Sequence, residues 1–338
     1  MAKENVAYSL VGTKYYVTAA LSDGRLLHLE NLAENIAWEE NKSEIAVRLN
    51  LTIRDIPFEK TRISKLLPLC TVIYLYAKWT GEPTKTEIFR GTVWEWEHSE
   101  THNDAIIITC YDLLYYLTKS SDNIYFTEGK QSSEICKSIL SKWSVPLSEY
   151  SAKSVSHKKI AYKNKTISAM LTETLDEVKK KTGKKAIVQA AKGKCRIVSQ
   201  GTNKTIWNFT ASSNLVSSND KYSMTNMVTR VVITGKEDDD ERTKVEATVE
   251  GNTKYGVFQQ LKSLGSASIA DAKAEANETI SEKGKPERTI TVVTPDIPSV
   301  RKGDMIHITN DALKGYFYVE GISHNATAAT MQMEVEPI

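Results

Sequence analysis

Two histidines have a spacing that could bind a metal ion. His98 and His102 lie four residues apart, and Glu95 and Glu97 precede them. Such a pair binds zinc on a helix, where side chains at i and i+4 share one face. The residue after His98 is Ser99, not the glutamate of an HExxH motif, and the surrounding pattern is strand, turn and strand. We therefore expect a solvated hairpin tip and no metal ion.

A second candidate for a cation site is the acidic run EDDDE at residues 237–241. It lacks the D-x-D-x-D-G spacing that arranges oxygens around one calcium ion, and no glycine provides the tight turn. A charge run between two strands is usually an exposed loop. We expect a solvated loop there, again without a metal ion.

Motifs for covalent catalysis and for phosphate binding are missing from the sequence. There is no G-x-S-x-G elbow, the six histidines follow no triad pattern, and neither GxGxxG nor GxxxxGK[ST] occurs. Trp94 and Trp96 could form a platform for a glycan, but we interpret them as residues of one strand face. The sequence thus predicts no catalytic residue, no cofactor and no enzymatic activity.

Cysteine content and charge narrow the class of protein further. Four cysteines far apart in sequence predict buried free thiols in a chain that folds in a reducing compartment: Cys70, Cys110, Cys136 and Cys195. The formal net charge of +2 gives no electrostatic footprint for nucleic acid or an anionic membrane. No apolar run approaches ~20 residues, and the first residues do not read as a signal peptide. We expect neither nucleic-acid recognition nor membrane insertion.

The elements that must position these residues are mostly strands as far as about residue 115. In residues 45–53 (IAVRLNLTI) apolar and polar side chains alternate, which is the pattern of a half-buried strand. Residues 71–79, 85–93, 92–97 and 105–110 predict further strands, with turns near residues 80–83 and 99–104. This spacing indicates a barrel or a sandwich.

Helices interrupt the strands in the middle of the chain. Apolar stripes predict helices over residues 131–143 and 168–181, and a shorter helical pattern covers residues 112–117. Residues 185–189 and 195–199 predict a hairpin. After residue 220 the pattern predicts strands at 227–235, 243–250, 289–293, 305–309, 315–321 and 331–335, with a helix at 266–283.

The predicted fold is therefore mainly β with an α+β insertion. We expect a first β-barrel over residues 1–115, a helical and α+β region over 116–220, and a second β-barrel over 221–338 with a helical excursion at about 255–284.

Three passages in a fixed order carry a family resemblance. The first is FRGTV at residues 89–93 with YDLLYYLTKS at 111–120, and the second is LDEVKKKTG at 175–183. The third comprises GDMIHI at 303–308, GYFYV at 315–319, His324 and TMQMEV at 330–335. Together they resemble the baseplate hub proteins of contractile phage tails and phage-tail-like bacteriocins. More narrowly, they are similar to the hub family of defective Bacillus-type prophages, a relative of the late control proteins of Mu-like phages.

The resemblance implies two tail-tube-like β-barrels in each subunit and a homotrimer that forms a pseudo-sixfold ring. This ring would join the hexameric tail tube protein to the trimeric spike protein and contact other baseplate proteins, with the tape measure protein as a further candidate partner. The implied location is a virion or tail-like particle assembled in the bacterial cytoplasm. His324 is expected to be structural, packed near the last hairpin. Since no lysozyme or peptidase is fused before Ile338, we expect lytic activity to come from another chain.

Two other functions stay open beside the structural hub. A cell-wall-degrading tail enzyme would need a cleft with two carboxylates ~5–9.5 Å apart. A peptidoglycan-binding module in residues 118–215 would use the helix-plus-hairpin unit that the pattern predicts there.

Overall fold

The computed structural model describes residues 4–6, 12–80, 83–99, 104–235, 243–265 and 268–338. The chain divides into two compact units, Met1–Ser218 with Thr291–Ile338, and Asn219–Ile290. These boundaries differ from the predicted division into residues 1–115, 116–220 and 221–338, which stays a prediction. His102, the acidic run at 237–241 and parts of the turns at 80–83 and 99–104 lie outside the described residues.

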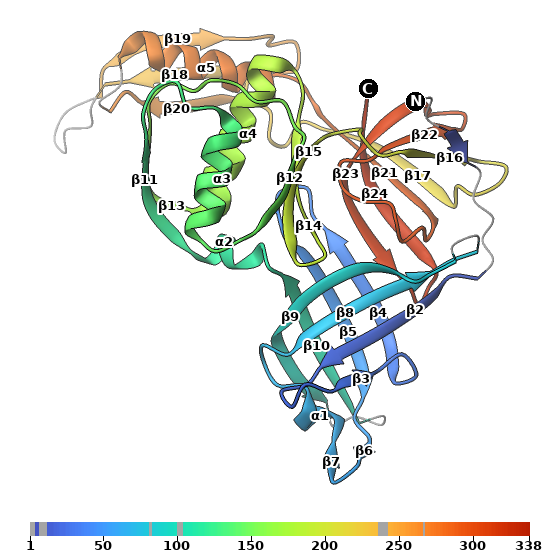
Figure 1. Ribbon diagram of the computed structural model, residues 1–338. Coiled ribbons are helices and arrows are strands. Elements are labelled where there is room, and N and C mark those ends of the chain that lie inside the picture. Colours follow the sequence, from blue (N-terminus) through green and yellow to red (C-terminus); the bar gives the residue numbers. More distant parts are fainter. Residues whose placement is uncertain (1–3, 7–11, 81–82, 100–103, 236–242, 266–267) are drawn as a thin grey trace. The chain divides into compact units, whose positions relative to one another are not determined.

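The first β region of the larger unit is an antiparallel run of strands in the order β4-β5-β10-β9-β8-β2-β3 (Figure 1). Val47, Leu49, Leu51 and Ile53 are all buried on one face, as the alternation predicts. The expected strands at 85–93 and 92–97 form one long strand. The bounds are β2 (Lys14–Ala20), β3 (Leu26–His28), β4 (Ala33–Glu40), β5 (Val47–Arg54), β8 (Val72–Lys78), β9 (Thr86–Ser99) and β10 (Ala105–Asp112).

The short elements outside this run are β1 (Glu4–Val6), β6 (Pro57–Phe58), β7 (Thr61–Arg62) and α1 (Ile63–Leu66). β1 pairs in parallel with β16 (Thr205–Thr210) of the second β region described below, and β6 pairs with β7.

The second β region has the order β16-β22-β23-β24-β21-β17. The last strand lies where the pattern predicts it, and its alternate residues Met331, Met333 and Val335 are buried on one face. β16 lies inside the stretch expected to belong to the insertion. The bounds are β16 (Thr205–Thr210), β17 (Ser217–Ser223), β21 (Glu287–Pro295), β22 (Met305–Thr309), β23 (Lys314–Asn325) and β24 (Thr330–Pro337).

One strand pair joins the two β regions into a single 14-stranded sheet. β23 pairs antiparallel with β4 in a register that places Ile322 opposite Glu40 and Asn325 opposite Ala37. The strand patterns predict each region but not this connection between them. The two regions are therefore held by backbone hydrogen bonds as well as by side chains.

The α+β insertion packs three helices against short strands around its own core. Thr166 caps the last of these helices by accepting a hydrogen bond from the Ala169 amide, and Gly183 ends it with φ 66°. The predicted helices and hairpin are confirmed, although β10 runs on to Asp112, so the helix expected from residue 112 begins only at Tyr115. The elements are α2 (Tyr115–Lys119), β11 (Ser121–Phe126), α3 (Ser132–Lys142), β12 (Leu147–Tyr150), β13 (Ile160–Thr166), α4 (Ile167–Thr182), β14 (Ala186–Ala191) and β15 (Lys194–Ser199).

The smaller unit is a three-stranded sheet with one helix. β18 (Arg230–Thr234) pairs antiparallel with β19 (Val245–Glu250) and parallel with β20 (Gln259–Ser263). α5 (Ile269–Lys283) buries Ala272 and Ala276. The helical excursion expected at 255–284 was thus partly wrong, because its first part contains β20.

The fold class predicted from the sequence is confirmed: the chain is mainly β with an α+β insertion. All four cysteines are free; Cys110, Cys136 and Cys195 are buried, but Cys70 is exposed, so the expectation of burial was wrong there. Burial raises the pKa of the Cys136 and Cys195 thiols to about 12. Within the described ranges we find no helix that is long and apolar enough to span a membrane.

Candidate functional site

Charged side chains gather where the two β regions meet the α+β insertion, around the segment RKGD at residues 301–304. Gly303 has φ +93°, and an added Cβ would lie 2.7 Å from Ile187 of β14. Its amide donates to the Val319 carbonyl at 2.7 Å. Only glycine fits this approach, so it holds the segment close to the insertion.

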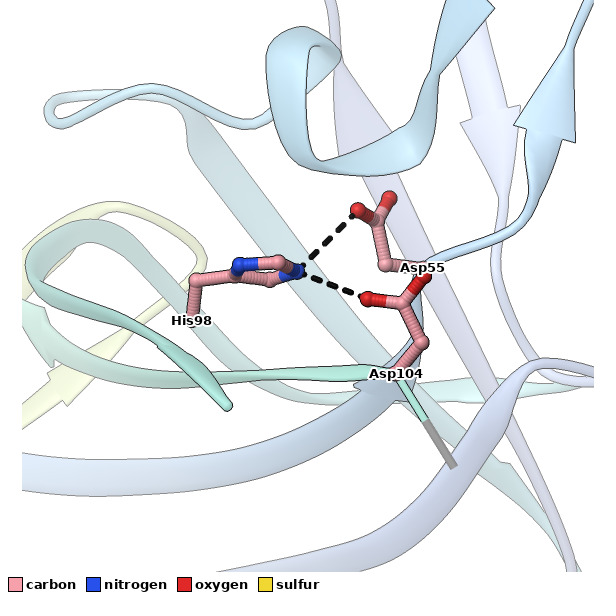
Figure 2. A group of neighbouring side chains, drawn as sticks. All are labelled: Asp55, His98 and Asp104. Atoms are coloured by element: carbon pink, nitrogen blue, oxygen red, sulfur yellow. Dashed lines mark hydrogen bonds and ion pairs between the residues drawn. The ribbon is translucent and has the colours of Figure 1, made fainter. Parts of the chain in front are cut away.

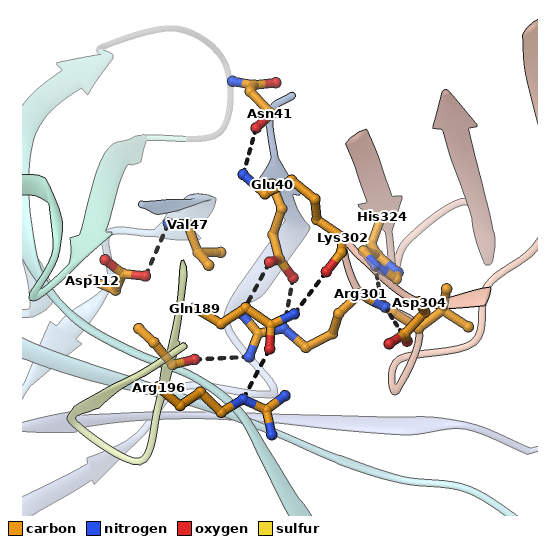
Figure 3. Close-up of polar contacts among 12 residues, drawn as sticks. Glu40, Asn41, Val47, Asp112, Gln189, Arg196, Arg301, Lys302, Asp304 and His324 are labelled. Atoms are coloured by element: carbon orange, nitrogen blue, oxygen red, sulfur yellow. Dashed lines mark hydrogen bonds and ion pairs between the residues drawn. The ribbon is translucent and has the colours of Figure 1, made fainter. Parts of the chain in front are cut away.

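Arg301 bonds groups in two other parts of the chain. Its Nε and one terminal nitrogen donate to the Glu40 carboxylate at 2.7 and 3.0 Å, and its other terminal nitrogen donates to the Ala190 carbonyl at 2.8 Å (Figure 3). Glu40 ends β4, and Ala190 lies on β14. The guanidinium therefore ties the first β region and the insertion to the second β region. Burial alone would lower its pKa, but the negative charges of Glu40, Asp112 and Asp304 together outweigh that effect and the pKa is raised.

Lys302 extends the same set of contacts. Its Nζ donates to the Asn41 carbonyl at 2.9 Å and also to the Glu44 carbonyl, while its own carbonyl accepts from Gln189 Nε2 at 2.7 Å. Burial lowers the pKa of the ammonium group. We call Glu40, Asp112, Gln189, Arg196, Arg301 and Lys302 the junction cluster.

Asp112, at the end of β10, is the most enclosed acid of this cluster. Its side-chain oxygens accept from the Val47 amide and the Leu114 amide, both at 2.9 Å. The residue is 2% exposed, and burial raises the pKa of its carboxyl to about 7.

His324 lies on β23 and is 1% exposed. Its ring stacks on Trp38 with centroids 4.3 Å apart. Nδ1 lies 2.6 Å from an Asp296 carboxylate oxygen, and Nε2 lies 3.2 Å from the Val300 carbonyl. The expectation of a packed structural histidine is confirmed.

A separate group contains Asp55, His98 and Asp104 (Figure 2). His98 Nε2 lies 2.8 Å from Asp104 Oδ1 and 3.5 Å from Asp55 Oδ2. The Arg62 guanidinium bonds both carboxylates, with Nε 2.9 Å from Asp55. Arg62 bonds both acids and the His98 ring lies against both, so the group is suited to fastening the end of the β9–β10 hairpin.

The sequence pattern points to His98, with His102, Glu95 and Glu97, as a candidate metal site, but it does not indicate the junction cluster. One signal was available for Glu40, which shares the inward face of β4 with Ile36 and Trp38. A carboxylate on a buried strand face needs a partner. Its partner Arg301 lies 261 residues away in sequence, and no local pattern points to it.

The junction cluster is arranged for holding rather than for reacting. Glu40 is paired with Arg301, and backbone amides occupy both oxygens of Asp112. Among the described residues, the cluster offers no nucleophile beside a free base. Its chemistry is that of a rigid connection between three parts of one unit.

Comparisons with known proteins agree with the sequence resemblance. The family model described as YqbQ-like matches residues 75–336. The uncharacterized protein YqbQ of Bacillus subtilis is 23% identical over 267 residues, which cover 77% of this chain and 79% of YqbQ.

Two solved structures share the fold over nearly their whole length. A tail protein from Neisseria meningitidis has a TM-score of 0.65 at 11% identity, with 95% of this chain and 96% of that one covered. The 43 kDa tail protein of prophage MuSo2 from Shewanella oneidensis has a TM-score of 0.63 at 10% identity, with 96% and 98% covered. The fold is therefore that of phage tail proteins.

Proposed function

The chain belongs to the YqbQ-like family, and we propose that it is a structural protein of a phage-type tail, namely its baseplate hub. Three copies would form a closed ring of six similar β regions between the hexameric tail tube and the trimeric spike. The protein would be located in a virion or tail-like particle that assembles in the bacterial cytoplasm. Its other contacts would be with baseplate proteins and the tape measure protein.

The observation that carries this proposal is the continuous sheet formed by two β regions of one chain. A ring with pseudo-sixfold symmetry needs the two regions of each chain at a constant mutual position. The β4–β23 pairing and the junction cluster both fix that position. The tail-protein fold supports the same interpretation.

Ring closure would also cover strand edges. β3 is a three-residue strand at one end of the sheet, and its Leu26 is 60% exposed. Exposed strand edges can pair with other chains, and an edge strand this short limits such pairing to a few backbone groups. A neighbouring subunit on this edge would convert that tendency into assembly.

Light scattering over a wide protein concentration range tests the proposal. A mass three times the 37.8 kDa of one chain is expected at high concentration, and addition of the tube or spike protein should increase the trimer fraction. A strictly monomeric or dimeric particle in the presence of both partners would overturn the hub assignment.

We further propose that the chain has no lytic activity of its own. Zymograms on peptidoglycan should show no clearing, and purified sacculi should not retain the protein. Reproducible lysis that one carboxylate substitution abolishes would favour the cell-wall-degrading alternative, and retention on sacculi would favour the binding module in residues 118–215.

A further inference from the structure

A cavity of about 250 Å³ lies beside the junction cluster within the larger unit. Strands β4 and β9, the β14–β15 hairpin and the segment before β22 contribute to its wall. The charged lining residues that matter here are Glu40, Glu87, Arg90, Asp112, Arg196 and Arg301.

Most of these charges are satisfied within the protein. Arg301 uses its nitrogens on Glu40 and on the Ala190 carbonyl. A terminal nitrogen of Arg90 donates to Glu87 Oε2 at 2.7 Å. Backbone amides occupy both oxygens of Asp112.

Glu87 Oε1 and Arg90 Nε are buried without a partner among the described residues. Arg196 is the third charged group of the lining that is not fully paired. Its Nε donates to Gln189 Oε1 at 2.9 Å, which orients the guanidinium plane. Figure 3 shows the two terminal nitrogens directed away from that contact, and within the described part of the chain they have no acceptor. Burial and the nearby Arg301 lower the pKa of Arg196, against the opposing effect of Asp304, Glu149 and Glu40. A bound anion at the two terminal nitrogens would stabilise the positive charge of Arg196, which burial and Arg301 disfavour.

The geometry of a guanidinium selects the ligand. Two parallel N–H groups match the two oxygens of a carboxylate or a phosphate. Glu87 Oε1 is buried without a partner in the same cavity wall, so a monoanion is favoured over a doubly charged phosphate. The volume lies below the ~300–1,000 Å³ of typical small-molecule sites and suits a single side chain. Lys192, exposed at the turn of the hairpin, adds positive charge to the lining.

We propose that this cavity binds one carboxylate, the acidic side chain of a partner protein, with the terminal nitrogens of Arg196 as its main ligands. The site is independent of the hub assignment, because it follows from the pairing of charges within one chain. In a tail particle it would make the junction a docking point for an acidic segment.

The test uses the full chain with ¹⁵N-labelled arginine. The Arg196 Nε–H is hydrogen-bonded, so its NMR signal should be visible, and the spectrum of Arg196→Lys identifies it. The probe is the tripeptide Gly-Glu-Gly with both ends blocked, at constant ionic strength. Matched probes are blocked Gly-Gln-Gly and inorganic phosphate.

The glutamate peptide should shift the Arg196 signal saturably, and the glutamine peptide should not. Arg196→Lys should weaken binding of the glutamate peptide several-fold, as followed on the signal of Arg301, which lines the cavity and whose Nε–H is hydrogen-bonded to Glu40. Lys194→Gln is the control, since Lys194 is exposed two residues away and does not line the cavity; this variant should bind like the unmodified protein.

Each other result contradicts the proposal. Equal shifts with both peptides, or no saturable shift with the glutamate peptide, would mean that no carboxylate site exists. Binding of phosphate but not of the glutamate peptide would assign the cavity to a different anion.

Discussion

Replacement of Arg301 by methionine removes the central ion of the junction cluster while it keeps most of the side-chain volume. The Glu40 carboxylate would then remain at a site where its side chain is 6% exposed, and the Ala190 carbonyl would lose its donor. Removal of one partner from a buried ion pair costs about 3–5 kcal/mol, because the other charge stays buried without compensation. We therefore expect Arg301→Met to lower the free energy of unfolding of the larger unit by that amount.

The matched control is Lys42→Met. Lys42 Nζ lies 2.6 Å from Glu334 on β24, so this pair also connects the two β regions, but its side chains are 53% and 34% exposed. Exposed ion pairs contribute about 0–1 kcal/mol. The double variant Glu40→Leu with Arg301→Met should recover much of the loss, because it removes both buried charges.

Urea unfolding followed by tryptophan fluorescence measures these changes in the appropriate unit. None of the six tryptophans lies in residues 219–290, so the signal reports on the larger unit alone: Trp38, Trp79, Trp94, Trp96, Trp143 and Trp207. If Arg301→Met costs no more than Lys42→Met, the junction cluster does not hold the β regions together.

Three further predictions concern single features of the fold. The raised pKa of Asp112 means that the contribution of this group to stability is greatest below pH ~4 and falls as the pH rises towards about 7, by up to about 4 kcal/mol. The unfolding free energy of the unmodified chain minus that of Asp112→Asn should therefore be larger at pH 5 than at pH 8, and a constant difference would refute the raised pKa. Gly91→Ala should lower the free energy of unfolding in urea by at least the ~1–3 kcal/mol typical of overpacking, because the new Cβ would lie 2.1 Å from the Tyr111 carbonyl oxygen. The control Gly235→Ala places its Cβ 3.5 Å from the nearest atom and should change the stability little. Equal effects of the two variants would show that the strand relaxes around the new methyl group. Deletion of residues 330–338 removes β24 with three buried side chains, each of which contributes ~1.5–3 kcal/mol to stability. This loss is comparable with the stability of a whole domain, so calorimetry should show no cooperative unfolding transition. A soluble product that unfolds cooperatively would contradict the inward packing of this strand.

Local patterns predict the strands and helices of this chain well. Alternation over residues 45–53 and 331–335 predicts the buried faces of β5 and β24, and the stripes of α3 and α4 predict their core. These signals work because each element buries one face, and its period appears in the sequence.

The same patterns fail where a long-range contact decides the structure. The β4–β23 pairing and the Glu40–Arg301 pair join residues more than 250 positions apart, and neither has a local period. β20 was missed for a similar reason: its exposed residues, among them Leu261, show no alternation, and the strand is defined by its pairing with β18. Gly303 belongs to the GDMIHI passage that carries the family resemblance, but the sequence does not show why a glycine is needed there. The structure gives the reason, because an added Cβ would lie 2.7 Å from Ile187.

The most direct test of the central proposal is an electron cryo-microscopy map of a purified tail particle that contains this chain. The account predicts three copies at the spike end of the tube, with six β regions around one channel and β4 paired to β23 within every copy. A map that places the chain elsewhere in the particle, or in any number of copies other than three per ring, would contradict it.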